Sequence, residues 1–282
     1  FSDNPSQRKM GQGRAIFGLT KDGSEFPAEI GLARFSDEGG FKTLATVMNM
    51  TEYMKITQEL KRSNKELNEF AYIASHDLKA PLRGIIQISS WIEEDISDHA
   101  NEETISYLKL LKNRTLRLEK ILDDLLAYSR IGSQSEEKQM VDTKLLFEST
   151  FELLDPPAGL RLIIQEGMPM FETFTTPLET IVRNLLGNAI KHHNKADGII
   201  SITVKEMSAY YEFSVIDDGP GIEPEYHKQI FDLFKTLNPR DQIEGSGMGL
   251  SIIKKILDVQ GGSITIMSDG KSGTCFTFLW PK

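Results

Sequence analysis

Apolar residues at helical spacing dominate the chain from about residue 53 onward. They recur in alternating steps of three and four, which is typical of a coiled-coil seam. The first seam comprises Leu60, Ser63, Leu67, Phe70, Ala74, Leu78, Pro81, Ile85, Ile88 and Ile92. After a polar break at 95–101, the second comprises Leu108, Leu111, Thr115, Leu118, Leu122 and Leu125. Because Gly132 suits a helix stop, the pattern predicts an antiparallel helical hairpin over 53–132.

Shorter alternating patterns flank this hairpin on both sides. Residues 1–52 contain strand-like runs at 26–32 and 43–48 with turn residues between them. After a polar linker at 133–139, strand patterns alternate with helical patterns to the end of the chain. The strands are expected near 160–165, 199–206, 210–217, 262–268 and 274–280, and the helices near 143–154, 176–193 and 247–260. The predicted fold class is therefore multidomain, α and α/β, with an α/β sandwich over 140–282.

A lone helical hairpin leaves one side of each apolar seam in water. Pairing two copies into a four-helix bundle covers both seams. The sequence therefore predicts a homodimer.

Composition and charge narrow the class of protein. The net charge of −9 and the lack of a basic stripe argue against a nucleic-acid partner. Cys275, the single cysteine, lies in an alternating run, which predicts a buried strand residue in a reducing compartment. No run approaches the roughly 18 apolar residues of a membrane span. We expect a cytoplasmic protein, with any membrane tether upstream of Phe1.

His76 is the first candidate for chemistry. On a helical wheel it lies almost opposite the seam, so its ring should face solvent. Asp77 can accept a hydrogen bond from one ring nitrogen, which leaves the lone pair of the other for an incoming phosphoryl group. Pro81 should loosen the helix just beyond. The alternative is an incidental surface histidine.

A second group of polar residues lies on the helix predicted to start near Thr176. Pro177 suits the first helical position, and Glu179 completes a capping-box pattern. On this register Asn184, Asn188 and Lys191 share one face, opposite the apolar residues. Two carboxamides and an ammonium suit Mg²⁺ when phosphates supply the negative oxygens. The alternative is an ordinary solvated face.

Two glycine-rich segments follow. Asp217 ends an apolar strand and precedes Gly219 and Gly221, so its carboxylate can accept a hydrogen bond from an adenine amino group. The alternative is a plain Asp-Gly turn. Further on, three glycines lead directly into a helix, where backbone amides can hold phosphate oxygens. This motif consists of Gly245, Gly247, Gly249 and Leu250.

Two aromatic residues lie between these segments. Phe231 and Phe234 precede a polar stretch, and we interpret 237–244 as a lid over a nucleotide. Both rings can also serve as anchors of a short helix.

The motifs, in this order, resemble the sensor histidine kinases of two-component signalling over 53–282. The last 140 or so residues are similar to the ATPase fold shared with gyrase, a heat-shock chaperone and mismatch-repair proteins. Residues 1–52 resemble the C-terminal part of a PAS sensor domain, including the exit motif at 49–52. The resemblance implies a dimer that phosphorylates itself from ATP and Mg²⁺ and then passes the phosphoryl group to an aspartate of a response regulator.

The same resemblance implies a role for each matching residue. His76 would be the phosphoacceptor with Asp77 as its acid–base partner. In the nucleotide pocket, Asn188 would bind Mg²⁺ with Asn184 beside it, Lys191 would contact phosphate and Asp217 would read adenine. The pocket would be shaped by Gly219, Gly221, Gly245, Gly247 and Gly249, and the lid anchored by Phe231 and Phe234.

This chain departs from the family pattern at two positions. Ala80 stands where many relatives have Thr or Asn, the residue associated with dephosphorylating the partner. Lys235 stands where the family often has Arg. Two other functions remain open from the sequence: an ATPase of the same superfamily that drives conformational change, and a non-catalytic dimeric signalling scaffold.

Overall fold

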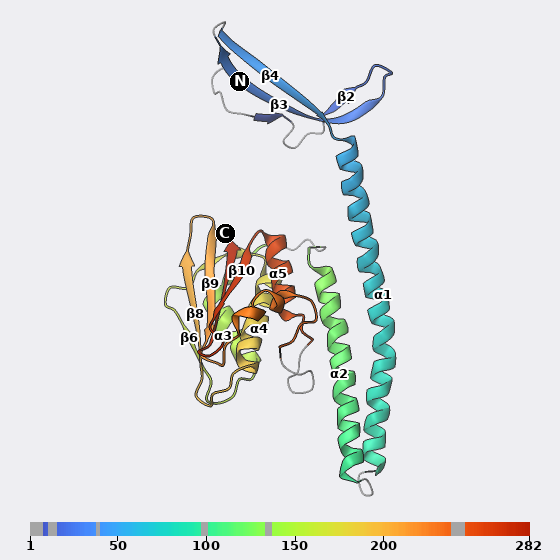
Figure 1. The fold of residues 1–282 in the computed structure, drawn as a ribbon, viewed down its shortest axis with the longest axis vertical. Coiled ribbons are helices and arrows are strands. Elements are labelled where there is room, and N and C mark those ends of the chain that lie inside the picture. Colours follow the sequence, from blue (N-terminus) through green and yellow to red (C-terminus); the bar gives the residue numbers. More distant parts are fainter. Residues whose placement is uncertain (1–7, 11–15, 38–39, 97–100, 133–136, 238–245) are drawn as a thin grey trace. The chain divides into compact units, whose positions relative to one another are not determined.

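A computed structural model describes residues 8–10, 16–37, 40–96, 101–132, 137–237 and 246–282 (Figure 1). The chain divides into two units, Phe1–Phe70 and Ala71–Lys282, and each is described by itself. Among the helices of the described ranges, none has the length and apolar content needed to cross a membrane.

The first unit contains a small antiparallel sheet. Its strands are β1 (Arg8–Met10), β2 (Phe17–Leu19), β3 (Glu25–Asp37) and β4 (Gly40–Asn49). The long strand β3 pairs with each of the other three. At the turn before β3, the Asp22 carboxylate accepts a hydrogen bond from the backbone N–H of Ser24 at 3.1 Å. The sequence predicted shorter versions of β3 and β4.

Two long helices follow, as the apolar spacing predicted. They are α1 (Thr51–Ile96), which contains Pro81, and α2 (Glu102–Arg130). Asn101 caps α2, because its side-chain oxygen accepts a hydrogen bond from the backbone N–H of Thr104 at 2.8 Å. Ion pairs between the helices fix their antiparallel register, including Lys79 with Asp123 and Arg83 with Glu119.

Among the hairpin residues whose burial the structure describes, small polar residues are the most buried. These are Ser75, Ser89, Thr115 and Ser129. The Ser89 hydroxyl donates to the Ile85 carbonyl oxygen at 2.7 Å, and the Thr115 hydroxyl donates to the Leu111 carbonyl oxygen at 2.8 Å. Each of these two hydroxyls is thus satisfied within its own helix.

Large apolar side chains of the hairpin face outward instead. Ile85 and Ile88 on α1 are 41% and 53% exposed. They belong to an outward stripe whose members lie three, four or seven residues apart and so share one helix face. We call it the outer stripe; it consists of Leu78, Ile85, Ile88 and Ile92 on α1, with Leu111 and Leu118 exposed on α2. Burying such a stripe requires a further surface.

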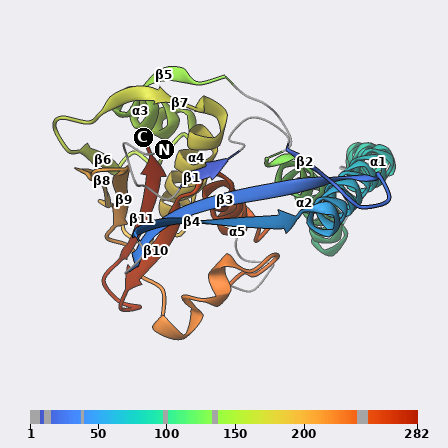
Figure 2. The same ribbon diagram turned by 90° about the horizontal axis from the view of Figure 1, so that it is seen from above.

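The remainder of the second unit is an α/β sandwich, as predicted. Its five-stranded sheet has the order β10-β11-β9-β8-β6, with β6 parallel to β8 and the other pairs antiparallel. The strands are β6 (Arg161–Ile164), β8 (Ile199–Glu206), β9 (Tyr210–Asp217), β10 (Ser263–Ser268) and β11 (Thr274–Pro281). One face is covered by α3 (Thr143–Leu153), α4 (Thr175–Lys191) and α5 (Gly249–Gln260) (Figure 2).

The core lies between this sheet and the helices. The apolar face of α4 is buried as predicted, at Leu178, Ile181, Val182, Leu185, Leu186 and Ala189. It meets alternate residues of the sheet such as Phe213 and Phe278, whose rings stack with centroids 5.2 Å apart. Burying large apolar side chains at about 25 cal/mol per Å² supplies the main stabilising term here. The core therefore fixes the register of α4 and turns its polar residues away from the sheet.

Three details differ from the sequence predictions. The capping box at Thr176 and Glu179 is wrong, because α4 begins at Thr175 after Phe174, which makes no side-chain cap. Cys275 lies in β11 but is only half-buried, since its neighbours Thr274 and Phe276 take the inward positions. A separate two-stranded sheet was not predicted, and it pairs β5 (Gln139–Asp142) with β7 (Met170–Thr173).

Candidate functional site

The imidazole of His76 faces solvent, as the helical wheel predicted. Its side chain is 74% exposed, and that of Asp77 is 73% exposed. Nδ1 of His76 lies 3.2 Å from Oδ1 of Asp77. Since a carboxylate only accepts hydrogen bonds, this contact favours the proton on Nδ1 and leaves the lone pair of Nε2 directed to solvent. The residue therefore has the tautomer of a nucleophile.

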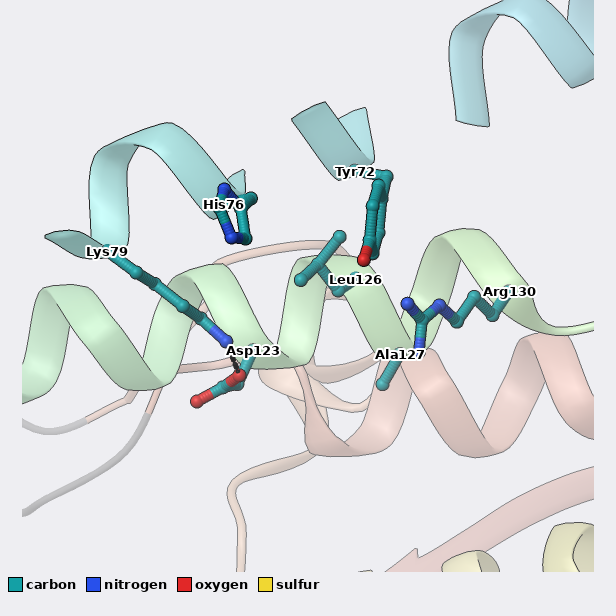
Figure 3. A pocket seen from close by; sticks show the side chains of 7 residues that line it. All are labelled: Tyr72, His76, Lys79, Asp123, Leu126, Ala127 and Arg130. Atoms are coloured by element: carbon teal, nitrogen blue, oxygen red, sulfur yellow. Dashed lines mark hydrogen bonds and ion pairs between the residues drawn. The ribbon is translucent and has the colours of Figure 1, made fainter. Parts of the chain in front are cut away.

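A hollow of about 350 Å³ opens beside His76 between the two helices (Figure 3). Lys79 crosses it to pair with Asp123, and the guanidinium carbon of Arg130 lies 5.1 Å from the centre of the Tyr72 ring. The lining residues are Tyr72, His76, Lys79, Asp123, Leu126, Ala127 and Arg130. Lys79 and Arg130 bring two cations to the hollow, and Asp123 brings one carboxylate. This hollow was not predicted from the sequence, because its two halves lie about fifty positions apart in the chain.

The polar face of α4 meets the start of α5. Nδ2 of Asn184 donates to the Thr180 carbonyl oxygen at 2.7 Å, and its Oδ1 points toward Gly249. A Cβ at position 249 would lie 2.7 Å from this oxygen, so only glycine allows the approach. Asn188 is half-buried and Lys191 exposed on the next two turns of the same helix face. The structure thus brings the Asn184 motif and the glycine motif together, as the hypothesis of one pocket requires.

Asp217 ends β9, and the loop that follows it lies near His193, just beyond the C-terminus of α4. Its Oδ1 accepts a hydrogen bond from the backbone N–H of Gly219 at 3.0 Å. Partial burial raises the pKa of the Asp217 carboxyl, and the Gly219 hydrogen bond opposes that rise. The backbone turns back at Gly221, which has a φ of +80°. Asp217 is therefore held as a half-buried acceptor at the C-terminal end of the central strand β9.

The two aromatic residues separate in the structure. Phe231 ends the short helix η2 (Gln229–Phe231) and packs against the core, whereas Phe234 is 42% exposed with a φ of +62°. The backbone beyond Phe234 lies against Gly247, where a Cβ would come within 2.8 Å of the Lys235 carbonyl oxygen. Gly245 and most of the expected lid lie outside the described residues. Leu250 packs against the core from the first turn of α5.

Two residues near Asp217, His193 and Asp218, have no role in the predictions from the sequence. His193 is buried and contacts Asp218 with its ring, Nε2 to Oδ1, at 2.8 Å. The sequence did not predict this contact, because Asp218 lies 25 residues after His193 in the chain. The described residues contain no group of three or more His, Cys, Asp or Glu side chains that could hold a metal ion.

Comparisons with known proteins agree with this geometry. The family model described as "His Kinase A (phospho-acceptor) domain" matches residues 66–134. A second, described as "Histidine kinase-, DNA gyrase B-, and HSP90-like ATPase", matches residues 174–282. Together they span more than half of the chain. The first contains His76, and the second contains Asn188 and Asp217.

Similar curated proteins include Cyanobacterial phytochrome B of Nostoc sp. (strain PCC 7120 / SAG 25.82 / UTEX 2576), 34% identical over 80% of this chain and 31% of its own length. Cyanobacterial phytochrome A of the same organism is 30% identical over 82% of this chain and 30% of its own length. This chain thus spans about a third of these relatives. Histidine protein kinase SaeS of Staphylococcus aureus (strain USA300) is 29% identical over 81% of this chain and 68% of its own length.

Solved structures show the same architecture. Full-length ShkA in complex with AMPPNP is 26% identical, with a TM-score of 0.58 over 76% of this chain and 45% of that one. Histidine kinase ThkA in complex with the response regulator protein TrrA has a TM-score of 0.53 at 23% identity, over 95% of this chain and 78% of that one. An exposed histidine on a helical hairpin, followed by an ATPase domain of this type, places the chain among the sensor histidine kinases.

Proposed function

We propose that this chain transfers the γ-phosphoryl group of ATP to its own His76 and then to an aspartate of a response regulator. One observation carries the proposal. The His76 ring is open to solvent, and Asp77 holds Nδ1 so that Nε2 keeps its lone pair. The ATPase domain that follows in the same chain would supply the nucleotide.

The chemical step at His76 follows from that tautomer. Nε2 attacks the γ-phosphorus, the bond from this phosphorus to the bridging oxygen breaks, and ADP leaves with the electron pair. The ring is then a phosphorylated imidazolium, and Asp77 stabilises its positive charge through Nδ1–H and can accept that proton. A positioned general base of this kind contributes typically about 10²–10⁴-fold in rate.

In this proposal the nucleotide is held by Asp217, by the polar face of α4 and by loop glycines. Asp217 would accept a hydrogen bond from the adenine amino group, and Lys191 would contact phosphate. The loop glycines, Gly219, Gly221, Gly247 and Gly249, would let backbone amides approach the ligand. Asn188 would hold Mg²⁺ through its carboxamide oxygen. The donor set fits that ion, which takes few protein ligands when phosphates supply the remaining oxygens; when bound, it neutralises phosphate charge.

A labelling time course tests the proposal directly. Purified protein incubated with γ-labelled ATP and Mg²⁺ should acquire label that acid removes and alkali does not. Transfer to a receiver domain should then remove the label from this chain. The response regulator in the ThkA structure is a partner of that protein. Steady phosphate release without any labelled protein would contradict the proposal and indicate an ATPase.

Nucleotide binding should depend on pH through Asp217. Because burial raises the pKa of this carboxyl, it gains its proton at a higher pH than an ordinary aspartate. The neutral acid is a poorer acceptor for the adenine amino group. The ratio of ATP affinity to ITP affinity should therefore fall as the pH is lowered through that raised pKa. Titration calorimetry with both nucleotides measures the ratio and cancels changes in the shared triphosphate.

The matched control for the pH series is Asp217→Asn, which has no titrating group at this position. Its affinity ratio should stay constant over the same pH range. A wild-type ratio that is equally constant would contradict the role of Asp217 as the adenine acceptor.

We also propose that two copies of the chain pair through the outer stripe. Ile85→Glu combined with Ile88→Glu would place two charges per chain in the interface. Burying unpaired charges is costly, so the dimer dissociation constant should rise by at least about 100-fold. Light scattering at micromolar concentration should then report the mass of one chain instead of two.

Gln87→Glu is the control for this pair, because position 87 lies on the opposite face of α1. It adds a charge without touching the outer stripe and should leave the dimer intact. A wild-type chain that is itself monomeric at this concentration would contradict the proposed pairing.

A further inference from the structure

The side chain of His193 lies just beyond the C-terminus of α4 and is only 4% exposed. Its Nε2 contacts Oδ1 of Asp218 at 2.8 Å, and its Nδ1 accepts a hydrogen bond from the backbone N–H of Lys195 at 3.2 Å. Both ring nitrogens are therefore engaged by the protein. Nδ1 also lies 3.3 Å from the Lys195 carbonyl oxygen. Because a carboxylate only accepts hydrogen bonds, Nε2 is the donor in the contact with Asp218.

Asp218 connects this ring to the sheet. The same Oδ1 accepts a hydrogen bond from the backbone N–H of Ile199, the first residue of β8, at 2.8 Å. Its Oδ2 pairs with Nζ of Lys195 at 2.9 Å. The hydrogen bond from Ile199 and the contact with Lys195 lower the pKa of Asp218 well below its usual range. An ionised carboxylate thus joins the end of α4 to the start of β8.

The His193 ring is tightly packed. A Cβ at Gly198 would lie 2.0 Å from Cε1 of the His193 ring. Since no side chain fits there, the ring packs directly on the backbone that leads into β8. Rotation of the ring is therefore blocked, and the direction of Nε2 is set by the surrounding chain.

Asp218 is also the residue after Asp217. Whatever holds the Asp218 side chain therefore restrains the peptide that joins it to the proposed adenine acceptor. Asp217 itself is paired in β9 with Ile200 of β8 and Thr274 of β11, and its carboxylate accepts a hydrogen bond from the Gly219 N–H at 3.0 Å. A Cβ at Gly219 would come within 3.8 Å of the His193 Cα, so the end of α4 and the Asp217 loop are neighbours.

We propose that His193 is a positioning residue that holds Asp217 in place through Asp218 and so sets the preference for adenine over other purines. The inference rests on the proposed function, because it assigns a support to the residue that would read the base. His193 acts through two carboxylates, Asp218 and Asp217, at the C-terminal end of the central strand β9.

The test compares ATP with ITP, which carries an oxygen in place of the 6-amino group. In His193→Ala the Asp218 carboxylate loses its buried donor and the Asp217 loop loosens. The dissociation constant for ATP should rise by about tenfold, the usual scale for one hydrogen bond to a charged group, while that for ITP changes little. The ATP-to-ITP affinity ratio should fall accordingly, and the phosphorylation rate at saturating ATP should be retained.

Three further variants make the test specific. His193→Gln can still donate to Asp218 from its side-chain amide and should recover part of the ratio. The double variant His193→Ala with Asp218→Ala should lower the ATP-to-ITP affinity ratio no more than Asp218→Ala alone, since both substitutions remove the same interaction. Lys282→Met, which breaks the ion pair with Glu206 at the other end of β8, should leave the ratio unchanged.

The outcomes separate the two proposals. A wild-type protein that binds ATP and ITP equally would contradict adenine reading by Asp217, whereas a protein that acquires no acid-labile label would contradict the proposed function. A wild-type protein that prefers ATP, with the same preference in His193→Ala, would overturn the role of His193 alone. Equal weakening of ATP and ITP binding in His193→Ala would likewise overturn it, because it would indicate general damage to the domain.

Discussion

His76→Gln should abolish the acid-labile label completely while leaving ATP affinity and the dimer unchanged. Glutamine is close to histidine in size and polarity, and the side chain at this position is 74% exposed, so folding should not suffer. The amide has no nucleophilic lone pair on nitrogen, so phosphoryl transfer loses its acceptor. Gel autoradiography after incubation with γ-labelled ATP measures the loss, and calorimetry measures ATP affinity.

Asp77→Asn should reduce labelling without abolishing it. The amide can still orient the ring but carries no charge to stabilise the imidazolium, so the labelling rate should fall by about 10²-fold. Glu66→Gln, which removes a surface ion pair with Arg62 on the same helix, is the control and should label normally. Persistent label in His76→Gln would refute the assignment of the acceptor.

Mixing two inactive variants shows which subunit supplies the nucleotide. A dimer formed from His76→Gln and a chain that cannot bind ATP contains one intact acceptor and one intact pocket, on different subunits. Label on the second chain means transfer between subunits, and its absence from mixed dimers means transfer within one subunit.

Asp217→Asn should reverse the base preference of the nucleotide pocket. The asparagine oxygen can keep the hydrogen bond from the Gly219 N–H, which turns the amide NH₂ toward the base. Two donors then face each other when ATP binds, whereas the 6-oxygen of ITP becomes an acceptor for the new amide. Sites that hydrogen-bond a specific group reject the wrong partner strongly, so we expect ATP affinity to fall by about 100-fold and ITP affinity to rise.

Calorimetry with both nucleotides measures this reversal, and labelling with γ-labelled ITP shows whether catalysis follows it. Glu212→Gln on the same strand is the control, since its side chain lies five positions before Asp217 in β9. Unchanged ATP affinity in Asp217→Asn would show that another residue reads the base.

The elements with strong periodicity could be predicted from the sequence. The helices α1 and α2 and the strands β8 and β9 follow their expected ranges closely, because their apolar spacing is set by burial on one face. The polar face of α4 was predicted for the same reason. Because Leu185 and Leu186 are buried, the helical register puts Asn184 and Asn188 on the face that points away from the core.

Features that depend on distant partners could not be predicted. The contact of His193 with Asp218 joins residues 25 positions apart, and the pairing of Lys79 with Asp123 joins residues 44 positions apart. The capping box failed for a local reason. A Thr-Pro sequence allows more than one starting residue, and the buried face of α4 decides in favour of Thr175.

The buried hydroxyls of the hairpin have a mechanical consequence. Ser89 and Thr115 donate hydrogen bonds within their own helices, so neither hydroxyl links α1 to α2. Their side chains are small, so their packing does little to prevent one helix from sliding along the other. Resistance to sliding of α1 along α2 then comes in large part from partly exposed ion pairs, such as that of Arg83 with Glu119. Since salt screens such pairs, the hairpin should become less stiff as the ionic strength rises.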